Sequence, residues 1–282
     1  MSAAQVPVGR LSICPTPIGN LRDVTLRTLD RLGEADLIAC EDTRRTRVLL
    51  DRYELTAKLV SFHEHNERER VEQLKARIRT GDHVALVSDA GTPLVSDPGY
   101  LLVRGCLDAN LPVEVLPGPS AVVAALVASG LPAERFEFVG FLPRKRTDLQ
   151  RLLDDAEQTL LAFESPHRLG QTLAIVAERE PARQAVVCRE LTKAHEEVRR
   201  GQASELAAHY AKAPARGEIV LVLAPATPKT GNEQAAIAAL RDLVEAGARK
   251  RAAASVVAAL TGVPANELYR ALTDEPPAPP RQ

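Results

Sequence analysis

Short apolar runs alternate with longer amphipathic segments along roughly the first 120 residues of the chain. The apolar runs have the length and the aliphatic composition of buried strands, and they lie at 11–14, 35–40, 58–63, 83–88 and 113–118. The spacing of apolar residues between them predicts helices through Leu26, Leu29 and Leu32, over 43–53 and over 67–81. Strands separated by helices are typical of an α/β sheet with parallel pairs.

The second half of the chain continues this pattern, but some of its strand-like runs follow one another directly. These runs lie at 136–142, 159–165, 185–190, 195–201 and 217–223, with helices expected at 147–157, 167–180 and near 203–213. Adjacent strands without a helix between them indicate a mixed sheet. The Pro-Gly-Pro stretch at 117–119 is the expected boundary between an N-terminal domain, 10–118, and a second domain, 119–224.

A change of composition after residue 223 indicates a separate C-terminal unit. A stretch rich in Pro, Thr, Gly and Lys comes first, and helical patterns follow at 233–247, 249–261 and 265–272. Gly262-Val263-Pro264 forms a tight turn between the last two, which indicates a small helix-turn-helix-like unit over 232–274. The predicted fold class is therefore α/β, with two α/β domains that contain mixed sheets and a small all-α extension.

Composition and charge argue against several classes of protein. Lys and Arg total 36 against 37 Asp and Glu, so a strongly basic nucleic-acid-binding protein is not indicated. Aromatic residues make up 3% and Trp is absent, which argues against rows of rings that stack on single-stranded nucleic acid. The four cysteines form no CxxC pair, no apolar run reaches membrane-span length, and no secretory signal is evident at the start. We therefore expect a cytoplasmic protein without a membrane partner, with its thiols buried and free.

Turns of unusual composition follow several of the predicted strands. They lie at 15–20, 88–93, 117–121 and 164–168, and none matches a dinucleotide-binding or P-loop motif. Ligands of open α/β sheets gather at the carboxyl ends of strands, so together these turns indicate a shared cleft, although each alone is explained by strand termination. Asp89 can brace its loop and Asp97 can cap the helix that follows, and for both residues direct contact with a ligand is the alternative interpretation.

Six motifs at these positions carry a family resemblance: "PTPIGNLRDVTLRTL", "CEDTRRT", "SFHEHNE", "SDAGTPLVSDPG", "VLPGPSA" and "FESPHR". Together they resemble the tetrapyrrole-methylase superfamily, from about residue 11 to residue 223. More narrowly, they resemble its bacterial branch that methylates the ribose 2′-oxygen of cytidine 1402, a decoding-centre nucleotide of 16S ribosomal RNA in the small subunit. The C-terminal helices also resemble the helix-turn-helix extension of that branch.

The resemblance implies S-adenosylmethionine as methyl donor in a cleft between two α/β domains, no metal, and a homodimer. This donor carries charged and polar groups but no phosphate, so stiff, mostly uncharged turns can pair with it through backbone groups. By analogy with the family, the residues that contact the donor are Pro17, Ala90, Gly91, Thr92, Leu94, Val95, Ser120, Ala121, Phe163, Gly217 and Glu218.

Methyl transfer to a ribose hydroxyl requires alignment of donor and acceptor and removal of one proton. The acceptor-side candidates, among which the sequence does not identify the base, are Asp23, Glu41, Asp42, His63, Glu64 and Asn66. Helix capping by Asp42 or Thr43 and a solvated charged face explain the same residues equally well.

Basic clusters provide candidate contacts to RNA phosphates, although each alone is typical of an ordinary solvated surface. The expected RNA-binding residues are Arg44, Arg45, Arg144, Lys145 and Arg146. The expected partner is 16S ribosomal RNA within the small subunit, whose shape would contribute to recognition of a nearly neutral protein.

Two other functions remain open at this point. One is a methyltransferase of the same fold that acts on a corrin or porphyrin precursor, which gives no reason for the helical extension. The other is a non-catalytic regulator that senses the donor and binds DNA through 233–272, although these Ala-rich helices carry one obvious basic cluster, at 249–251.

Overall fold

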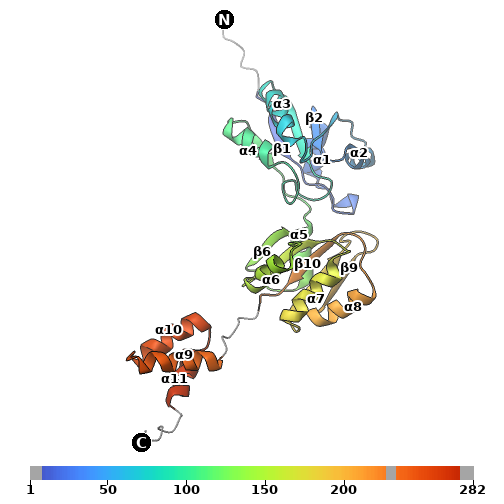
Figure 1. Cartoon of the computed structure of the whole chain (residues 1–282). Helices are drawn as coiled ribbons and strands as arrows, with labels where there is room; N and C mark the ends of the chain where they lie inside the picture. The colour runs from blue at the N-terminus through green and yellow to red at the C-terminus, as the bar shows by residue number, and fades with distance from the viewer. Residues whose placement is uncertain (1–7, 227–232, 274–282) are drawn as a thin grey trace, which may run out of the picture. The chain divides into compact units, whose positions relative to one another are not determined.

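The computed structural model describes residues 8–226 and 233–273 and divides the chain into two compact units, 1–225 and 226–282. Figure 1 shows the two sheets of the first unit and the three helices of the second. The expected domain limits at 118/119 and 232/274 remain a prediction, because the two sheets belong to one compact unit. Within the described residues, no helix is both long and apolar enough to cross a membrane.

The first sheet is parallel throughout and has the strand order β3-β2-β4-β1-β5. Its strands are β1 (Arg10–Ile13), β2 (Leu37–Cys40), β3 (Leu59–Ser61), β4 (His83–Val87) and β5 (Val113–Val115). The connecting elements are η1 (Leu21–Asp23), α1 (Leu26–Glu34), α2 (Thr43–Arg52), α3 (Glu67–Arg79) and α4 (Tyr100–Asp108). Two parallel strands require a crossover connection between them, and the helices between successive strands provide it. The parallel direction of the strands is therefore the one that the sequence pattern predicts.

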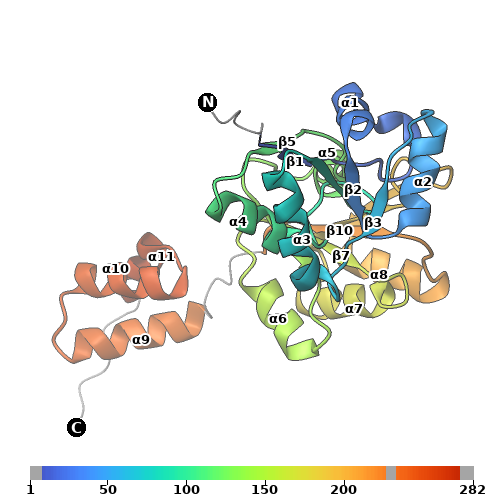
Figure 2. The ribbon, with the colours of Figure 1, turned by 90° about the horizontal axis from the view of Figure 1, so that it is seen from above.

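Both faces of this sheet are covered by helices, which explains its continuous apolar strands. Leu74 of α3 and Leu102 of α4 pack on one face, and Leu32 of α1 and Leu50 of α2 pack on the other. Figure 2 shows α3 and α4 on one side of these strands and α1 and α2 on the opposite side. Because the strands are parallel, their carboxyl ends all lie at the same end of the sheet, where the connecting turns meet.

The second sheet is mixed and has the order β6-β7-β10-β8-β9, with β6 and β7 parallel and the other pairs antiparallel. Its strands are β6 (Phe136–Phe141), β7 (Thr159–Glu164), β8 (Gln184–Arg189), β9 (Glu197–Gln202) and β10 (Ile219–Leu223). Helix α5 (Ala121–Ser129) covers one face, and α6 (Arg146–Asp154), α7 (Leu169–Arg179) and α8 (Ala203–Lys212) cover the other. The predicted fold class is confirmed, with antiparallel pairing confined to this sheet.

The C-terminal helices α9 (Glu233–Glu245), α10 (Lys250–Thr261) and α11 (Ala265–Thr273) have a core of their own. Leu240, Val257 and Leu268 are buried in it, one from each helix. Gly262 ends α10 with a φ of +71°, which a glycine adopts without steric cost. The sharp turn between α10 and α11 that the sequence predicts is therefore present.

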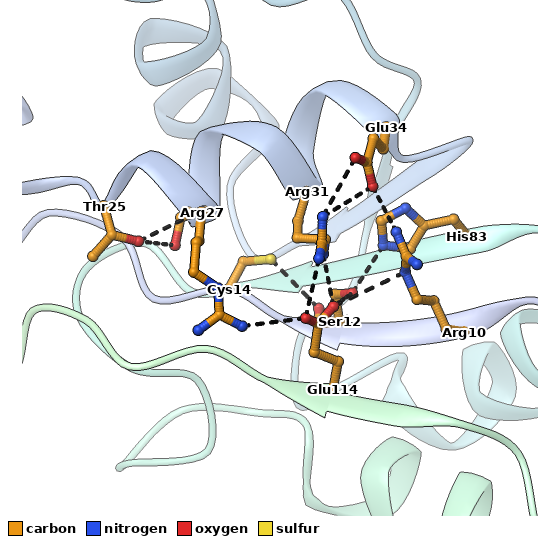
Figure 3. A network of polar contacts seen from close by, with 10 residues as sticks. Arg10, Ser12, Cys14, Thr25, Arg27, Arg31, Glu34, His83 and Glu114 are labelled. Atoms are coloured by element: carbon orange, nitrogen blue, oxygen red, sulfur yellow. Dashed lines mark hydrogen bonds and ion pairs between the residues drawn. The ribbon is translucent and has the colours of Figure 1, made fainter.

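A polar network attaches α1 to the edge of the first sheet (Figure 3). Arg31 of α1 donates to Glu114 of β5 at 2.8 Å, and the Ser12 hydroxyl donates to the same carboxylate at 3.2 Å. The Ser12 hydroxyl also lies 2.9 Å from His83 Nε2. Beside this network, burial raises the pKa of the Cys14 thiol to about 12. All four cysteines are buried and free, as expected for thiols that serve as small core residues.

Candidate functional site

A cavity of ≈ 400 Å³ lies where the carboxyl ends of the first sheet meet the second sheet. Turns of both sheets line it, together with the first residues of α5 and the ends of β7 and β10. Its lining residues are Ile18, Arg45, Asp89, Ala90, Gly91, Thr92, Val95, Asp97, Ser120, Ala121, Val122, Phe141, Phe163, Glu164, Ser165, Pro166, Cys188, Leu191, Gly217, Glu218, Ile219 and Val220. The turns that the sequence selects therefore do converge on one space.

Hydrogen bonds fasten three of the turns to one another. Thr16 and Gly91 exchange two backbone hydrogen bonds of 2.9 Å, and the Thr92 hydroxyl donates to the Pro119 carbonyl at 3.2 Å. Gly91 has a φ of +83°, which glycine adopts without steric cost, and the Ser88 hydroxyl donates to its carbonyl at 3.2 Å. This side of the cavity is therefore a preformed backbone surface.

The second sheet contributes an aromatic wall. Phe163 lies at the centre, with ring centroids 5.1 Å from Phe138 and 5.5 Å from Phe141. The register of β6 against β7 shifts between Phe138 and Phe141, as in a β-bulge, and such irregularities re-aim side chains next to functional sites. Phe141 is 64% exposed although it lines the cavity, so its ring is available to a ligand at the rim.

A cluster of charged residues links two connections of the second sheet beside the cavity. Lys193 donates to Glu190 and to Glu218, each at 2.9 Å, and Glu190 accepts the backbone N–H of Glu218 at 2.9 Å. The same segment reaches the first sheet, because the Thr192 hydroxyl accepts the N–H of Asn20 at 3.0 Å. The sequence indicated Gly217 and Glu218 but gave no signal for residues 190–193.

The residues expected to hold the donor lie in this cavity, apart from Pro17 and Leu94, which are not among its lining residues. The sequence did not indicate Ile18, Phe141 and Leu191, and for Asp97 it left helix capping and ligand contact as alternatives. Ile18 adjoins Pro17, so the turn at 15–20 reaches the cavity through the neighbouring residue.

The charges of the lining suit a cationic ligand. Asp89, Asp97, Glu164 and Glu218 contribute carboxylates, and Arg45 is the one basic lining residue in the described part of the chain. Arg45 is itself paired with Asp89 at 3.5 Å. An S-adenosylmethionine with sulfonium, ammonium and carboxylate groups carries a net positive charge, so the acidic lining, the aromatic wall and the start of α5 fit its different parts.

The expectation that Asp97 caps α4 is wrong. The cap comes from Glu67 at the start of α3, whose Oε1 accepts the N–H groups of Gly99 at 3.0 Å and Leu101 at 3.1 Å. Asp97 lines the cavity instead, where burial, followed by the nearby charges of Glu41 and Asp89, raises its pKa to about 6. A distant glutamate performs the capping, which no local sequence pattern reveals.

Asp97→Asn is expected to stabilise the protein above pH 6. Because the folded state raises the pKa of Asp97 from its ordinary value to about 6, the folded protein binds this proton more tightly than the unfolded chain. Ionisation therefore lowers the free energy of unfolding progressively between about pH 4 and pH 6. After allowance for solvent screening, urea unfolding at pH 7.5 should show a gain of about 1 kcal/mol that vanishes at pH 4. An equal gain at both pH values would contradict this account.

The acceptor-side candidates do not all come together. Asp42 caps α2 by accepting the N–H of Arg44 at 2.8 Å, and the Arg44 guanidinium lowers the pKa of Asp42 to about 2. A carboxylate held so acidic is a weak base. Asn66 is also committed to its loop, because its amide oxygen accepts the N–H of His63 and its nitrogen donates to the Ser61 carbonyl.

Glu41 and His63 do not line the cavity, but the charge of Glu41 interacts with Asp89, which does, and with His63. Burial, and then the charge of Asp89, raises the pKa of Glu41, whereas Arg45 and His63 act in the opposite direction. Glu64 and Asp23 are exposed, Asp23 at the end of η1. In the described part of the chain, no group of three or more His, Cys, Asp or Glu is arranged to hold a metal ion.

The expected RNA-binding residues lie in two places. Arg44 and Arg45 are exposed at the start of α2, each paired with an aspartate, and Arg45 reaches the cavity. Arg144, Lys145 and Arg146 are exposed before and at the start of α6, where Arg146 pairs with Glu178. Both groups therefore offer surface cations, and their contact with RNA remains a prediction.

The match to a known family gives the class of this two-sheet protein, a methyltransferase. Residues 10–207 match the family model of the Tetrapyrrole (Corrin/Porphyrin) Methylases. The chain belongs to this family, as its motifs indicate.

Similar proteins agree with this assignment. A "Ribosomal RNA small subunit methyltransferase I" from Mesorhizobium japonicum is 48% identical, with 94% of this chain and 91% of that protein covered. A protein of the same name from Thermotoga maritima is 45% identical, with 77% of this chain and 98% of that protein covered. A uroporphyrin-III C-methyltransferase from Thermus thermophilus, solved with S-adenosylhomocysteine, has a TM-score of 0.54 at 21% identity and covers 77% of this chain and 97% of its own.

Proposed function

We propose that this protein transfers the methyl group of S-adenosylmethionine to the ribose 2′-oxygen of a decoding-centre cytidine, cytidine 1402 of 16S ribosomal RNA, within the small ribosomal subunit. The observation that carries this proposal is the likeness, over nearly the whole chain, to relatives named ribosomal RNA small subunit methyltransferase I. The acidic cavity supports the choice of donor, because it suits a sulfonium cation. We place the reaction in the cytoplasm and the protein in a homodimer.

Different residues of the cavity suit different chemical groups of the donor. The N–H groups at the start of α5, next to Ser120 and Ala121, suit its carboxylate, since helix N-termini favour anions. The carboxylates that line the cavity favour its positive groups, and Phe163 provides an apolar wall. The bound donor supplies an activated methyl group with a good leaving group, so the protein's remaining tasks are to align the ribose and to accept its proton.

We assign the chemistry to the first unit, residues 1–225. The family match at 10–207 and every lining residue of the cavity lie within it. The relative from Thermotoga maritima is almost fully covered although it matches only 77% of this chain. The C-terminal helices would then add affinity for the substrate rather than chemistry.

Methylation of purified small subunits tests the proposal. Subunits from cells that lack this protein are incubated with it and with labelled donor, and mass mapping of the RNA locates the new methyl group. We expect one methyl group on the ribose of the decoding-centre cytidine. A parallel incubation with a tetrapyrrole precursor tests the alternative substrate, and label in the macrocycle but not in RNA would overturn the proposal.

A further inference from the structure

The loop between β4 and α4 leads the chain into α4 through an unusual backbone. Leu94 and Ser96 have φ angles of 74° and 64°, in the left-handed region that residues other than glycine seldom adopt. Gly99 follows with a φ of +132°, and a Cβ at this position would lie 2.8 Å from side-chain atoms of Leu86 and Leu94. Such conformations persist where the surrounding structure imposes them, and they gather at functional sites. Tight packing therefore fixes the place where α4 begins.

Tyr100 is the first residue of α4 and carries the most exposed aromatic side chain of the protein. It is 67% exposed, slightly more than Phe141, and every other Phe or Tyr is less accessible. Its backbone is held on both sides, because Glu67 Oε1 accepts the N–H groups of Gly99 and Leu101. In the part of the chain that the structure describes, the Tyr100 side chain makes no hydrogen bond and no ring contact. The fold therefore presents this ring to solvent from a fixed backbone and does not use it in the core.

Tyr100 lies at the end of the first sheet that faces the cavity. A helix that follows a parallel strand begins at the carboxyl end of that strand, and the cavity lies at this end of the sheet. Asp97, in the same loop, lines the cavity, and three residues of chain place the Tyr100 Cα within about 11 Å of the Asp97 Cα. Tyr100 itself is not part of the lining. An RNA strand whose ribose enters the cavity can therefore also cover Tyr100, outside the space that suits the donor.

An exposed cation accompanies this ring. Helices α3 and α4 enclose a groove of ≈ 320 Å³, which is lined by Arg68 and by Leu101, the residue that follows Tyr100. The other two cations of the groove, Lys75 and Arg104, are each paired with a carboxylate of their own helix. Arg68 is exposed and forms no ion pair within the described residues. A free guanidinium next to an exposed ring suits a nucleic acid, since it can pair with a phosphate while the ring stacks on a base.

We propose that Tyr100 and Arg68 form a further contact with the acceptor RNA, an inference that rests on the proposed function. The Tyr100 ring stacks on a nucleobase of the strand that carries the acceptor ribose, and Arg68 pairs with a phosphate of that strand. Proteins recognise unpaired bases of RNA by stacking them on aromatic side chains, and a single firmly held ring does this without the rows of rings that the composition excludes. Tyr100 and Arg68 are positioning residues, which hold the ribose at the cavity and take no part in methyl or proton transfer.

Tyr100→Ala and Tyr100→Phe separate the ring from the rest of the side chain. Single-turnover methylation is measured against the concentration of small subunits purified from cells that lack this protein. We expect the half-saturating concentration to rise about 10-fold in Tyr100→Ala and to stay within about threefold of wild type in Tyr100→Phe, because a base stacks on either ring. The rate at saturation and the Kd for S-adenosylmethionine should change less than about threefold in both. Leu107→Ala, on the same helix and 54% exposed, is the matched control and should behave like the wild type.

Three results would overturn the role of Tyr100. The first is an unchanged half-saturating concentration in Tyr100→Ala. The second is an equal loss in Tyr100→Phe, which would assign the effect to the hydroxyl and not to stacking. The third is a change of oligomeric state in Tyr100→Ala, measured by light scattering, which would mean that the ring contacts a second copy of the chain.

Arg68→Gln tests the phosphate contact through its dependence on salt. Loss of one contact should reduce the slope of log affinity for the subunit against log salt concentration by about one. Arg79→Gln, the same change at the other, exposed end of α3, is the control and should leave the slope unchanged. A slope in Arg68→Gln equal to that of the wild type contradicts the role of Arg68.

A second measurement does not depend on methyl transfer. The chain contains no Trp, so Tyr100→Trp, labelled with 5-hydroxytryptophan, gives a single reporter that is excited apart from the tryptophans of ribosomal proteins. With S-adenosylhomocysteine present, titration with small subunits should quench this reporter strongly and leave the same label in Leu107→Trp nearly unchanged. Equal quenching at both positions, or none at position 100, contradicts stacking wherever the methyl group goes. Quenching confined to Tyr100→Trp, together with a subunit that the wild-type protein leaves unmethylated, contradicts the proposed function instead.

Discussion

Gly91→Val is expected to weaken binding of S-adenosylmethionine about 100-fold, or about 2.7 kcal/mol. Gly91 has a φ of +83°, which is costly for a β-branched residue. A Cβ at this position would lie 3.4 Å from Ile18 Cγ2, in van der Waals contact, so the two methyl groups that valine carries beyond Cβ would crowd this part of the lining. Valine therefore strains the turn that pairs with Thr16 and places its methyl groups against the donor space.

Calorimetric titration with S-adenosylmethionine measures this effect, and Gly130→Val is its matched control. Gly130 has a φ of +73° at the end of α5, and a Cβ there would meet nothing within 4 Å. The control carries the same kind of backbone strain without reaching the cavity, so it should lower stability and leave the Kd unchanged. Equal losses of affinity in the two variants would mean that strain alone, and not occupation of the cavity, explains the result.

Local sequence patterns were sufficient to predict most of the fold. The strands predicted at 83–88 and 217–223 are short, have a continuous apolar centre and are bounded by turn residues, so neighbouring positions in the sequence define their length and their ends. The turns at 15–20, 88–93 and 117–121 were predictable as a group because parallel strands bring their carboxyl ends to one edge. Family resemblance, not periodicity, selected the residues within them.

The features that were missed depend on contacts between distant parts of the chain. Asp97-Pro98 resembles a local helix cap, and only the folded structure shows that Glu67 satisfies the same N–H groups from another helix. Phe141 reaches the cavity through a shift in the register of β6, and the sequence alone does not fix register. The ion pairs of Lys193 join Glu190, which follows β8, to Glu218, which precedes β10. The sequence therefore shows where carboxylates lie along the chain, but tertiary packing determines which of them caps a helix and which faces the cavity.

Glu67→Ala is expected to lower the free energy of unfolding by about 3 kcal/mol, because it leaves two N–H groups at the start of α4 without their acceptor. Glu67 is 8% exposed, so water replaces its carboxylate poorly. Glu67→Gln keeps a carbonyl acceptor and should cost about 1 kcal/mol, mainly through loss of the charge beside the helix N-terminus. Urea unfolding at pH 7.5 measures both variants.

Glu69→Ala is the matched control for this effect, since Glu69 lies in the same turn of α3 but is exposed, and it should stay within about 0.5 kcal/mol of wild type. If Glu67 holds the cap so that Asp97 can face the cavity, Glu67→Ala allows Asp97 to turn back and cap α4 itself. The NMR pKa of Asp97 should then fall from about 6 toward the value of an ordinary or capping aspartate. A destabilised Glu67→Ala protein in which Asp97 still titrates near pH 6 would show that the strained backbone at Leu94 and Ser96 is sufficient to hold the carboxylate in place.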